Sequence, residues 1–181
     1  SLFSLSNVII QSSINTYGTY VVAGNAAGSN LDGFLYIAMN SVYTAALTFV
    51  GQNVGAGKYA RIKKISFLCV GLVTFIGVSL GVVLVVFGEK LLLIFATGEN
   101  KDAVVKAGMN RLLVMGTTYF LCGLMDVGCG IMRGMGKTIL PMIVSLVGSC
   151  LFRIVWIATV CPLFPGNILA LYISYPISWF I

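Results

Sequence analysis

The chain alternates between long apolar stretches and short breaks that are polar or rich in glycine. A bilayer core of roughly 30 Å takes about 20 apolar residues in a helix. Four of the stretches reach that length, and each carries at most one charge. The pattern therefore predicts four membrane-spanning helices, built on residues 33–54, 65–87, 112–132 and 139–164.

The two ends of the chain are also apolar and predict a first and a last helix. The chain starts at Ser1 rather than Met and stops inside a hydrophobic run. We therefore expect a piece of a longer protein whose end helices are cut short. The predicted fold is all-α, a polytopic bundle of six transmembrane helices at residues 2–17, 30–55, 62–88, 102–132, 138–163 and 167–181.

The breaks between the apolar stretches predict the connections. Residues 24–30 are typical of a loop, with Ser29 or Asn30 capping the next helix. Glycines within residues 55–58 end the second predicted helix. Residues 134–138 separate the fourth predicted helix from the fifth.

Composition indicates what surrounds this bundle of helices. The chain is 59% hydrophobic and only 9% charged, against roughly 25% charged residues in an ordinary soluble domain. So few charges cannot cover a water-facing surface without large apolar patches. We expect a multi-pass protein of the cell membrane, with lipid as a partner.

Composition also excludes several kinds of site. The chain has no His, so catalytic triads, His-based zinc sites and haem axial His are absent. Its five cysteines form no CxxC pair. The net charge of +6 is too sparse for a nucleic-acid groove. We expect no metal site, no nucleic-acid partner and no enzymatic activity.

The placement of Lys and Arg predicts the orientation. The connections after the second and the fourth predicted helix carry six basic residues. The loop between the third and fourth predicted helices carries four basic residues, mixed with acidic ones. We therefore expect the loops near residues 58–64 and 133–137 to be cytoplasmic. The six are Lys58, Arg61, Lys63, Lys64, Arg133 and Lys137, and the four are Lys90, Lys101, Lys106 and Arg111.

Asp126 is the most informative charge, because it lies inside a predicted span. A carboxylate there costs about 2.5–3.5 kcal/mol on insertion scales, so it normally faces the bundle interior or a watery cavity. Such a group suits exchange of a proton for a cation, in ion coupling or substrate binding. The alternative is a structural partner for Arg133 or Arg153. We expect Arg153 itself to be structural, donating to backbone carbonyls or to a buried carboxylate.

Polar side chains recur at helical spacing on two predicted helices. Tyr36, Asn40 and Tyr43 form one stripe and can line an aqueous cavity, with tyrosine rings available to a cation. Asn7 and Gln11 are cavity-lining candidates on the first helix, and Asn15 continues their stripe. The alternative is hydrogen bonding between helices.

Glycine patterns add two points. Gly136-Lys137-Thr138 lacks the upstream glycine of a phosphate-binding loop, so a nucleotide site is excluded. Three pairs of glycines four residues apart predict close helix packing in lipid. The pairs are Gly51 and Gly55, Gly77 and Gly81, and Gly130 and Gly134.

Two sequence elements carry a resemblance to a known family. Residues 46–58 read ALTFVGQNVGAGK, and residues 131–138 read IMRGMGKT and are followed by Pro141. The first resembles the second-helix element of multidrug and toxic compound extrusion (MATE) transporters, and the second matches their R-G-x-G-[DK]-T-x-x-P element. Residues 20–26 are more similar to the second half of such proteins than to the first.

The resemblance implies a fold and a function. MATE transporters have twelve helices in two six-helix lobes and export organic cations and drugs in exchange for Na⁺ or H⁺. Residues 1–181 would form the C-terminal lobe, inactive alone, with the missing N-terminal lobe of the same chain as partner and no cofactor besides the coupling ion. Asp126 matches an aspartate of a cation site in one branch. That branch also uses a glutamate on the first helix of this lobe, and the present sequence has none there.

Two other functions stay open. A flippase for lipid-linked precursors, from the same superfamily, would favour a strongly basic cavity. A non-transporting membrane subunit would not need Asp126.

Overall fold

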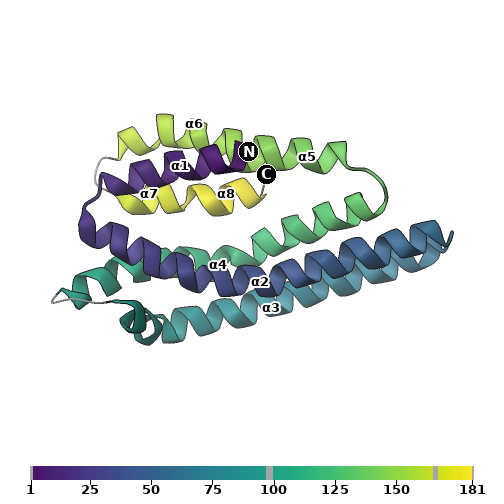
Figure 1. Cartoon of the computed structure of the whole chain (residues 1–181), viewed down its shortest axis with the longest axis horizontal. Coiled ribbons are helices and arrows are strands. Elements are labelled where there is room, and N and C mark those ends of the chain that lie inside the picture. Colours follow the sequence, from purple (N-terminus) through teal and green to yellow (C-terminus); the bar gives the residue numbers. More distant parts are fainter. Residues whose placement is uncertain (1, 97–99, 165–166, 181) are drawn as a thin grey trace.

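The computed structural model describes residues 2–96, 100–164 and 167–180, with side chains from Val8 onward. These residues form helices packed in two layers (Figure 1). The long helices α2, α3 and α4 make one layer, and the other contains the short or broken helices. The elements are α1 (Leu2–Asn15), α2 (Thr19–Gly55), α3 (Tyr59–Phe95), α4 (Lys101–Gly134), α5 (Ile139–Ser145), η1 (Leu146–Leu151), α6 (Phe152–Thr159), η2 (Cys161–Leu163), α7 (Ile168–Tyr172) and α8 (Ser174–Phe180).

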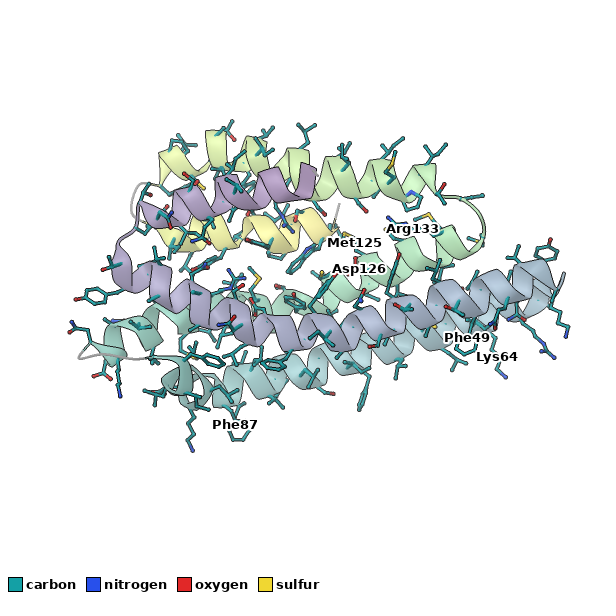
Figure 2. All side chains as sticks on the ribbon, viewed as in Figure 1. Phe49, Lys64, Phe87, Met125, Asp126 and Arg133 are labelled. Carbon is teal, nitrogen blue, oxygen red and sulfur yellow. The ribbon has the colours of Figure 1, made fainter. Side chains whose placement is uncertain are left out.

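The surface of the bundle is that of a membrane protein. Four helical segments are long and apolar enough to cross a bilayer, and α7 with α8 adds a shorter apolar pair. Large apolar side chains such as Phe49 and Phe87 point away from the bundle (Figure 2), and each is at least half exposed. The prediction of an all-α, multi-pass membrane protein is confirmed. The four segments are Thr19–Gly55, Tyr59–Phe95, Lys101–Gly134 and Ile139–Leu163.

The predicted loop at residues 24–30 is wrong, because these residues lie inside α2. The helix starts at Thr19, directly after Gly18 with φ of 99°. Its small residues serve close packing instead of a break: a Cβ on Gly24 would lie 2.5 Å from the carbonyl oxygen of Val104 in α4. In lipid, small residues at helix contacts are the usual means of close backbone approach.

The fifth predicted helix, residues 138–163, is not one regular helix. It begins as α5, widens into the single π-helical turn η1, continues as α6 and ends in the 3-10 turn η2. The last predicted helix is also broken, since α7 ends at Tyr172 and α8 begins at Ser174. Pro176 has no N–H to donate to the Tyr172 carbonyl four residues earlier, which explains the break.

The paired glycines let α4 pack closely against α3 and α2. A Cβ on Gly81 would collide with the carbonyl oxygen of Gly116, and one on Gly77 would lie 2.9 Å from Phe120. Gly130 and Gly134 make equally close approaches to α2. Close packing is therefore confirmed at these two pairs, whereas Gly55 faces open space.

Two turns end helices in the same way. Gly57 and Gly136 have positive φ, 68° and 83°, which only glycine adopts without strain. In each turn the following lysine N–H donates to a carbonyl five residues back, at 2.8 Å for Lys58 and 3.0 Å for Lys137. This is the hydrogen-bond pattern of a Schellman C-cap. The predicted glycine stop at residues 55–58 is confirmed.

Candidate functional site

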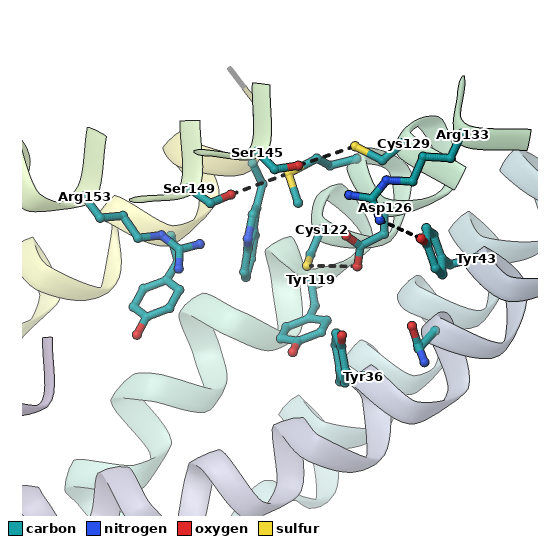
Figure 3. Close-up of a pocket in the computed structure, with 14 residues that line it drawn as sticks. Tyr36, Tyr43, Tyr119, Cys122, Asp126, Cys129, Arg133, Ser145, Ser149 and Arg153 are labelled. Atoms are coloured by element: carbon teal, nitrogen blue, oxygen red, sulfur yellow. Dashed lines mark hydrogen bonds between the residues drawn. The ribbon is translucent and has the colours of Figure 1, made fainter. Parts of the chain in front are cut away.

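A polar cavity of about 540 Å³ lies between the two layers (Figure 3). α2 and α4 form one wall, and α5, η1, α6 and α8 form the other. Tyrosine, tryptophan and charged side chains dominate its lining. The lining residues are Tyr36, Asn40, Tyr43, Tyr119, Cys122, Met125, Asp126, Cys129, Arg133, Ser145, Ser149, Arg153, Tyr175 and Trp179.

The stripe predicted on α2 lines this cavity. Tyr36, Asn40 and Tyr43 follow one another along α2 at its edge. Because the three side chains lie about one helical turn apart, they share a face, and the face next to it carries buried residues such as Met39. The structure therefore brings these three predicted residues together.

On the first helix, the described part of the predicted stripe, Gln11 and Asn15, does not line the cavity. Gln11 is exposed, and its amide donates to Asn15 Oδ1 at 3.2 Å. α1 instead buries Ile10 and Ile14 against the bundle, which turns the polar face outward. The side chain of Asn7 lies outside the described residues.

Asp126 lies in the cavity, on the wall formed by α4. The Cys122 thiol, one helical turn earlier, donates a long contact of 4.0 Å to its Oδ2, which is the hydrogen bond found for this carboxylate among the described residues. Neither Arg133 nor Arg153 forms an ion pair with Asp126 in the described part of the chain, where the ion pair found joins Arg111 to Asp32. The structural interpretation of Asp126 as a salt-bridge partner therefore finds no contact to support it.

Arg133 reaches the same cavity from the last turn of α4. Its Nη1 donates to the Tyr43 hydroxyl at 2.8 Å (Figure 3). From the sequence alone, Arg133 belongs with the basic residues of the connection that follows this helix. The arginine is long enough to turn back from the helix end to the cavity.

Arg153 is a buried cavity residue, 8% exposed. Its Nε donates to the Ser178 hydroxyl at 2.9 Å, and its guanidinium lies 4.3 Å from the centre of the Tyr175 ring. The expected partners, backbone carbonyls or a carboxylate, are thus replaced by a hydroxyl and an aromatic ring. Trp179, 5.8 Å away, adds a second ring.

Sequence reasoning missed the aromatic end of the cavity. Tyr119 and Trp179 stack edge to face with ring centres 5.3 Å apart, and Tyr175 lies 6.0 Å from Trp179. Two of these three rings belong to α8. They could have been found only by asking which face of the last helix is polar, since Tyr175, Ser178 and Trp179 recur at helical spacing.

Sequence reasoning also missed a second buried polar cluster. Arg111 donates through Nε to Asp32 Oδ2 at 2.9 Å and through Nη1 to Asn25 Oδ1 at 2.7 Å. The Tyr172 hydroxyl donates to the same Asn25 oxygen at 3.3 Å. The charge pattern assigns Arg111 to the outer loop, but the residue lies inside the bundle and does not contribute to the orientation count.

Comparison with known proteins identifies the family. The family model MatE matches residues 1–159. The chain belongs to the MatE family. Similar proteins include "Probable multidrug resistance protein YoeA" of Bacillus subtilis (strain 168), 25% identical over 80% of this chain and 31% of that protein. YpnP, a second "Probable multidrug resistance protein" of that strain, is 30% identical over 80% of this chain and 32% of its own length.

Two further comparisons extend this result. "Probable multidrug resistance protein NorM" of Pasteurella multocida (strain Pm70) is 29% identical over 76% of this chain and 28% of its own length. A solved MOP superfamily transporter from Pyrococcus furiosus superposes with a TM-score of 0.88 at 16% identity, covering 99% of this chain and 39% of that one. The predicted MATE resemblance and fold are confirmed. This MatE chain spans about a third of the length of the relatives that it matches.

Proposed function

We propose that this chain is the C-terminal lobe of a two-lobed secondary antiporter that exports organic cations and drugs in exchange for Na⁺ or H⁺. The fold, the family and the names of its relatives support this proposal. The lobe works only together with an N-terminal lobe, because transport by rocking requires two bodies around one site.

The observation that carries the proposal is Asp126 in an aromatic cavity. A carboxylate without a salt-bridge partner in the described bundle attracts a cation. The faces of Tyr36, Tyr43 and Tyr119 offer cation–π contacts to an organic cation. Asp126 thereby binds the cationic substrate, or it binds the coupling ion that is exchanged for the substrate.

The orientation is part of the proposal. The turns at residues 56–58 and 135–138 lie at the same end of the bundle (Figure 1). Basic residues flank both turns, which favours the cytoplasmic side of the cell membrane. The cavity then lies within the membrane-spanning region.

Ethidium efflux tests the proposal. Cells express the transporter made of this chain and its N-terminal lobe, with Na⁺ and pH gradients imposed separately. Wild type is expected to export ethidium under one of the two gradients. Asp126→Asn keeps the side-chain volume and removes the charge, so we expect at least a tenfold slower efflux, in the range of losses typical for a removed charge interaction.

Asp102→Asn is the matched control, because Asp102 lies exposed in the first turn of the same helix. It should leave efflux unchanged. Normal export by an Asp126→Asn protein that reaches the membrane would refute a transport role for Asp126. Absence of efflux in wild type would refute the proposal of cation export.

One observation favours a second candidate, a flippase for lipid-linked precursors. The cavity contains two guanidinium groups, Arg133 and Arg153, and a phosphate-bearing headgroup suits them. The carboxylate of Asp126 in the same cavity favours the antiporter. We propose no enzymatic activity and no cofactor besides the coupling ion, because a lone carboxylate offers little acid–base chemistry.

A further inference from the structure

A second hollow lies outside the cavity, at the turn that leads from α4 into α5. Its volume is about 400 Å³, and its lining residues are Gly136, Lys137, Thr138, Ile139, Leu140 and Ile143. None of these residues lines the cavity between the two layers. The hollow is at the end of the bundle that carries the two basic turns (Figure 1). It is therefore separate from the proposed transport site.

Lys137 and Thr138 form the polar edge of the hollow. Both residues are exposed, and Lys137 makes no ion pair in the parts of the chain that the structure describes. Thr138 precedes the first turn of α5, yet its side chain makes no capping hydrogen bond. An ammonium group and a hydroxyl group are donors that suit a phosphate. The Gly-Lys-Thr element, which lacks the pattern of a nucleotide site, thus presents donors to a phosphate of another kind.

The rest of the hollow is apolar. Ile139, Leu140 and Ile143 are large aliphatic residues, and all three are exposed. Ile139 and Ile143 are four positions apart, so they share one face of α5. This face starts at the polar edge and continues into the apolar segment Ile139–Leu163, which is long enough to cross a bilayer. A lipid acyl chain suits such a surface, because it extends from a headgroup into the apolar core of the bilayer.

Charge selects the kind of lipid headgroup. Besides Lys137, this end of the bundle exposes four basic residues, Lys58, Arg61, Lys63 and Lys64. Residues 51–67 and 131–145 contain no acidic residue, and the exposed acids Glu89 and Asp102 belong to the opposite end. Figure 2 shows Lys64 at the basic end. An anionic headgroup is attracted to this uncompensated positive charge, whereas a zwitterionic headgroup brings an ammonium group of its own.

We propose that the hollow at the turn between α4 and α5 binds one anionic phospholipid. The phosphate lies at Lys137 and Thr138, and one acyl chain lies along Ile139, Leu140 and Ile143. This inference goes beyond the proposed function, because it names a partner that binds outside the transport cavity. It holds for any transported substrate.

Lipid titration followed by native mass spectrometry tests the headgroup preference. The transporter made of this chain and its N-terminal lobe is purified in detergent. It is titrated with dioleoylphosphatidylglycerol, which is anionic, or with dioleoylphosphatidylcholine, which is zwitterionic and has the same acyl chains. We expect the first phosphatidylglycerol to bind about tenfold more tightly than the first phosphatidylcholine, because several basic residues attract the anionic headgroup.

Two lysine variants distinguish the hollow from the basic surface around it. Lys137→Gln should lower the affinity for phosphatidylglycerol about fivefold and leave that for phosphatidylcholine unchanged, because it removes the cation at the phosphate. Lys63→Gln is the matched control. Lys63 is exposed at the same end of the bundle and lies one helical turn from the exposed Phe67, but it is outside the hollow. Its replacement should have a clearly smaller effect.

Photocrosslinking locates the lipid on the protein. A phosphatidylglycerol with a diazirine in one acyl chain is incorporated into phosphatidylcholine nanodiscs that contain the transporter. After irradiation, the adducts are mapped by peptide mass spectrometry. We expect adducts within residues 139–143 of the wild type and a loss of these adducts in Lys137→Gln. Adducts that avoid residues 139–143 in the wild type would overturn the inference.

A soluble competitor distinguishes a lipid from a free phosphate. Glycerol phosphate has the phosphate of the lipid without its acyl chains, so it should not displace phosphatidylglycerol at equal concentration. Displacement would assign the hollow to a soluble anion and contradict the inference. Equal affinities for the two lipids, or an unchanged affinity for phosphatidylglycerol in Lys137→Gln, would also overturn it. Equal losses in Lys137→Gln and Lys63→Gln would show attraction to the whole basic end instead of binding in the hollow.

Discussion

Asp32 and Arg111 are two charges that the bundle holds away from the cavity. Each is less than 10% exposed, and they meet at 2.9 Å. Asn25 and Tyr172 extend the contact to α7, so four residues connect α2, α4 and the broken last helix. One Asp32 oxygen, Oδ1, has no hydrogen-bond partner in the described structure. The cluster is therefore sensitive to the loss of any one member.

Breaking this pair on one side should destabilise the protein strongly. Asp32→Ala leaves the Arg111 charge buried without its carboxylate, at a cost of about 3–5 kcal/mol. Thermal unfolding in detergent, monitored by light scattering or circular dichroism, measures the loss. Replacing both members with apolar residues, Asp32→Leu with Arg111→Met, should recover most of it. If the double variant is as unstable as the single one, the pair has a role beyond charge neutralisation.

At the scale of elements, α3 and α4 depend on small residues more than on interlocking large ones. The backbones approach so closely at Gly81 that its α-hydrogen faces the Gly116 carbonyl. Such an approach favours dispersion contacts, which drive helix association in lipid. Any side chain larger than hydrogen must push the two helices apart.

Gly81→Ala tests this contact. We expect the variant to lose about 1–3 kcal/mol of stability, since an added methyl group in a packed interface forces the backbones apart. Gly71→Ala is the matched control on the same helix, because a Cβ there meets nothing within 4 Å. The control should be neutral or slightly stabilising, by up to about 1 kcal/mol. Equal melting temperatures for the two variants would contradict the proposed packing.

Some of the helices could be predicted from the sequence, and others could not. Hydropathy predicted the spans at 65–87 and 112–132, because lipid selects for apolar length regardless of partner. It failed at residues 24–30, where the same small and polar residues that form loops in water form helix contacts in lipid. Tyr36, Asn40 and Tyr43 were found because helical spacing is local.

The remaining site residues could not be found in that way. Asp32 and Arg111 are 79 positions apart, so their pairing exists only after α2 and α4 pack. Arg153 with Tyr175 likewise depends on contact between α6 and α8. Periodicity reports which face of one helix is polar and says nothing about which other helix that face meets.

At the scale of the whole molecule, the two ends of the bundle differ in charge. One end carries the basic turns at residues 56–58 and 135–138, and the other carries the start of α4 at Lys101 (Figure 1). Four of the five native cysteines are buried, and Cys161 is partly exposed. An engineered surface cysteine can therefore report the side of the membrane on which it lies.

Cysteine labelling should reveal opposite sides for the two ends. Lys58→Cys and Lys137→Cys are expected to react with a membrane-impermeant maleimide only in inside-out vesicles, and Asn100→Cys only in intact cells, because basic turns stay in the cytoplasm. The unmodified protein supplies the background from Cys161. Labelling of Lys58→Cys and Lys137→Cys from opposite sides would contradict the fold itself.

The π-helical turn η1 keeps three polar side chains on the same face of their helix. Ser145, Ser149 and Arg153 all face the cavity, although positions four apart drift about 40° per step around a straight α-helix. The wider turn over Leu146–Leu151 takes up more residues per turn and cancels that drift. The same four-residue spacing on the regular helix α1, at Gln11 and Asn15, has no such turn, and both side chains are exposed. Loss of the wider turn η1 would therefore rotate Arg153 out of the row that it forms with Ser145 and Ser149 along the cavity.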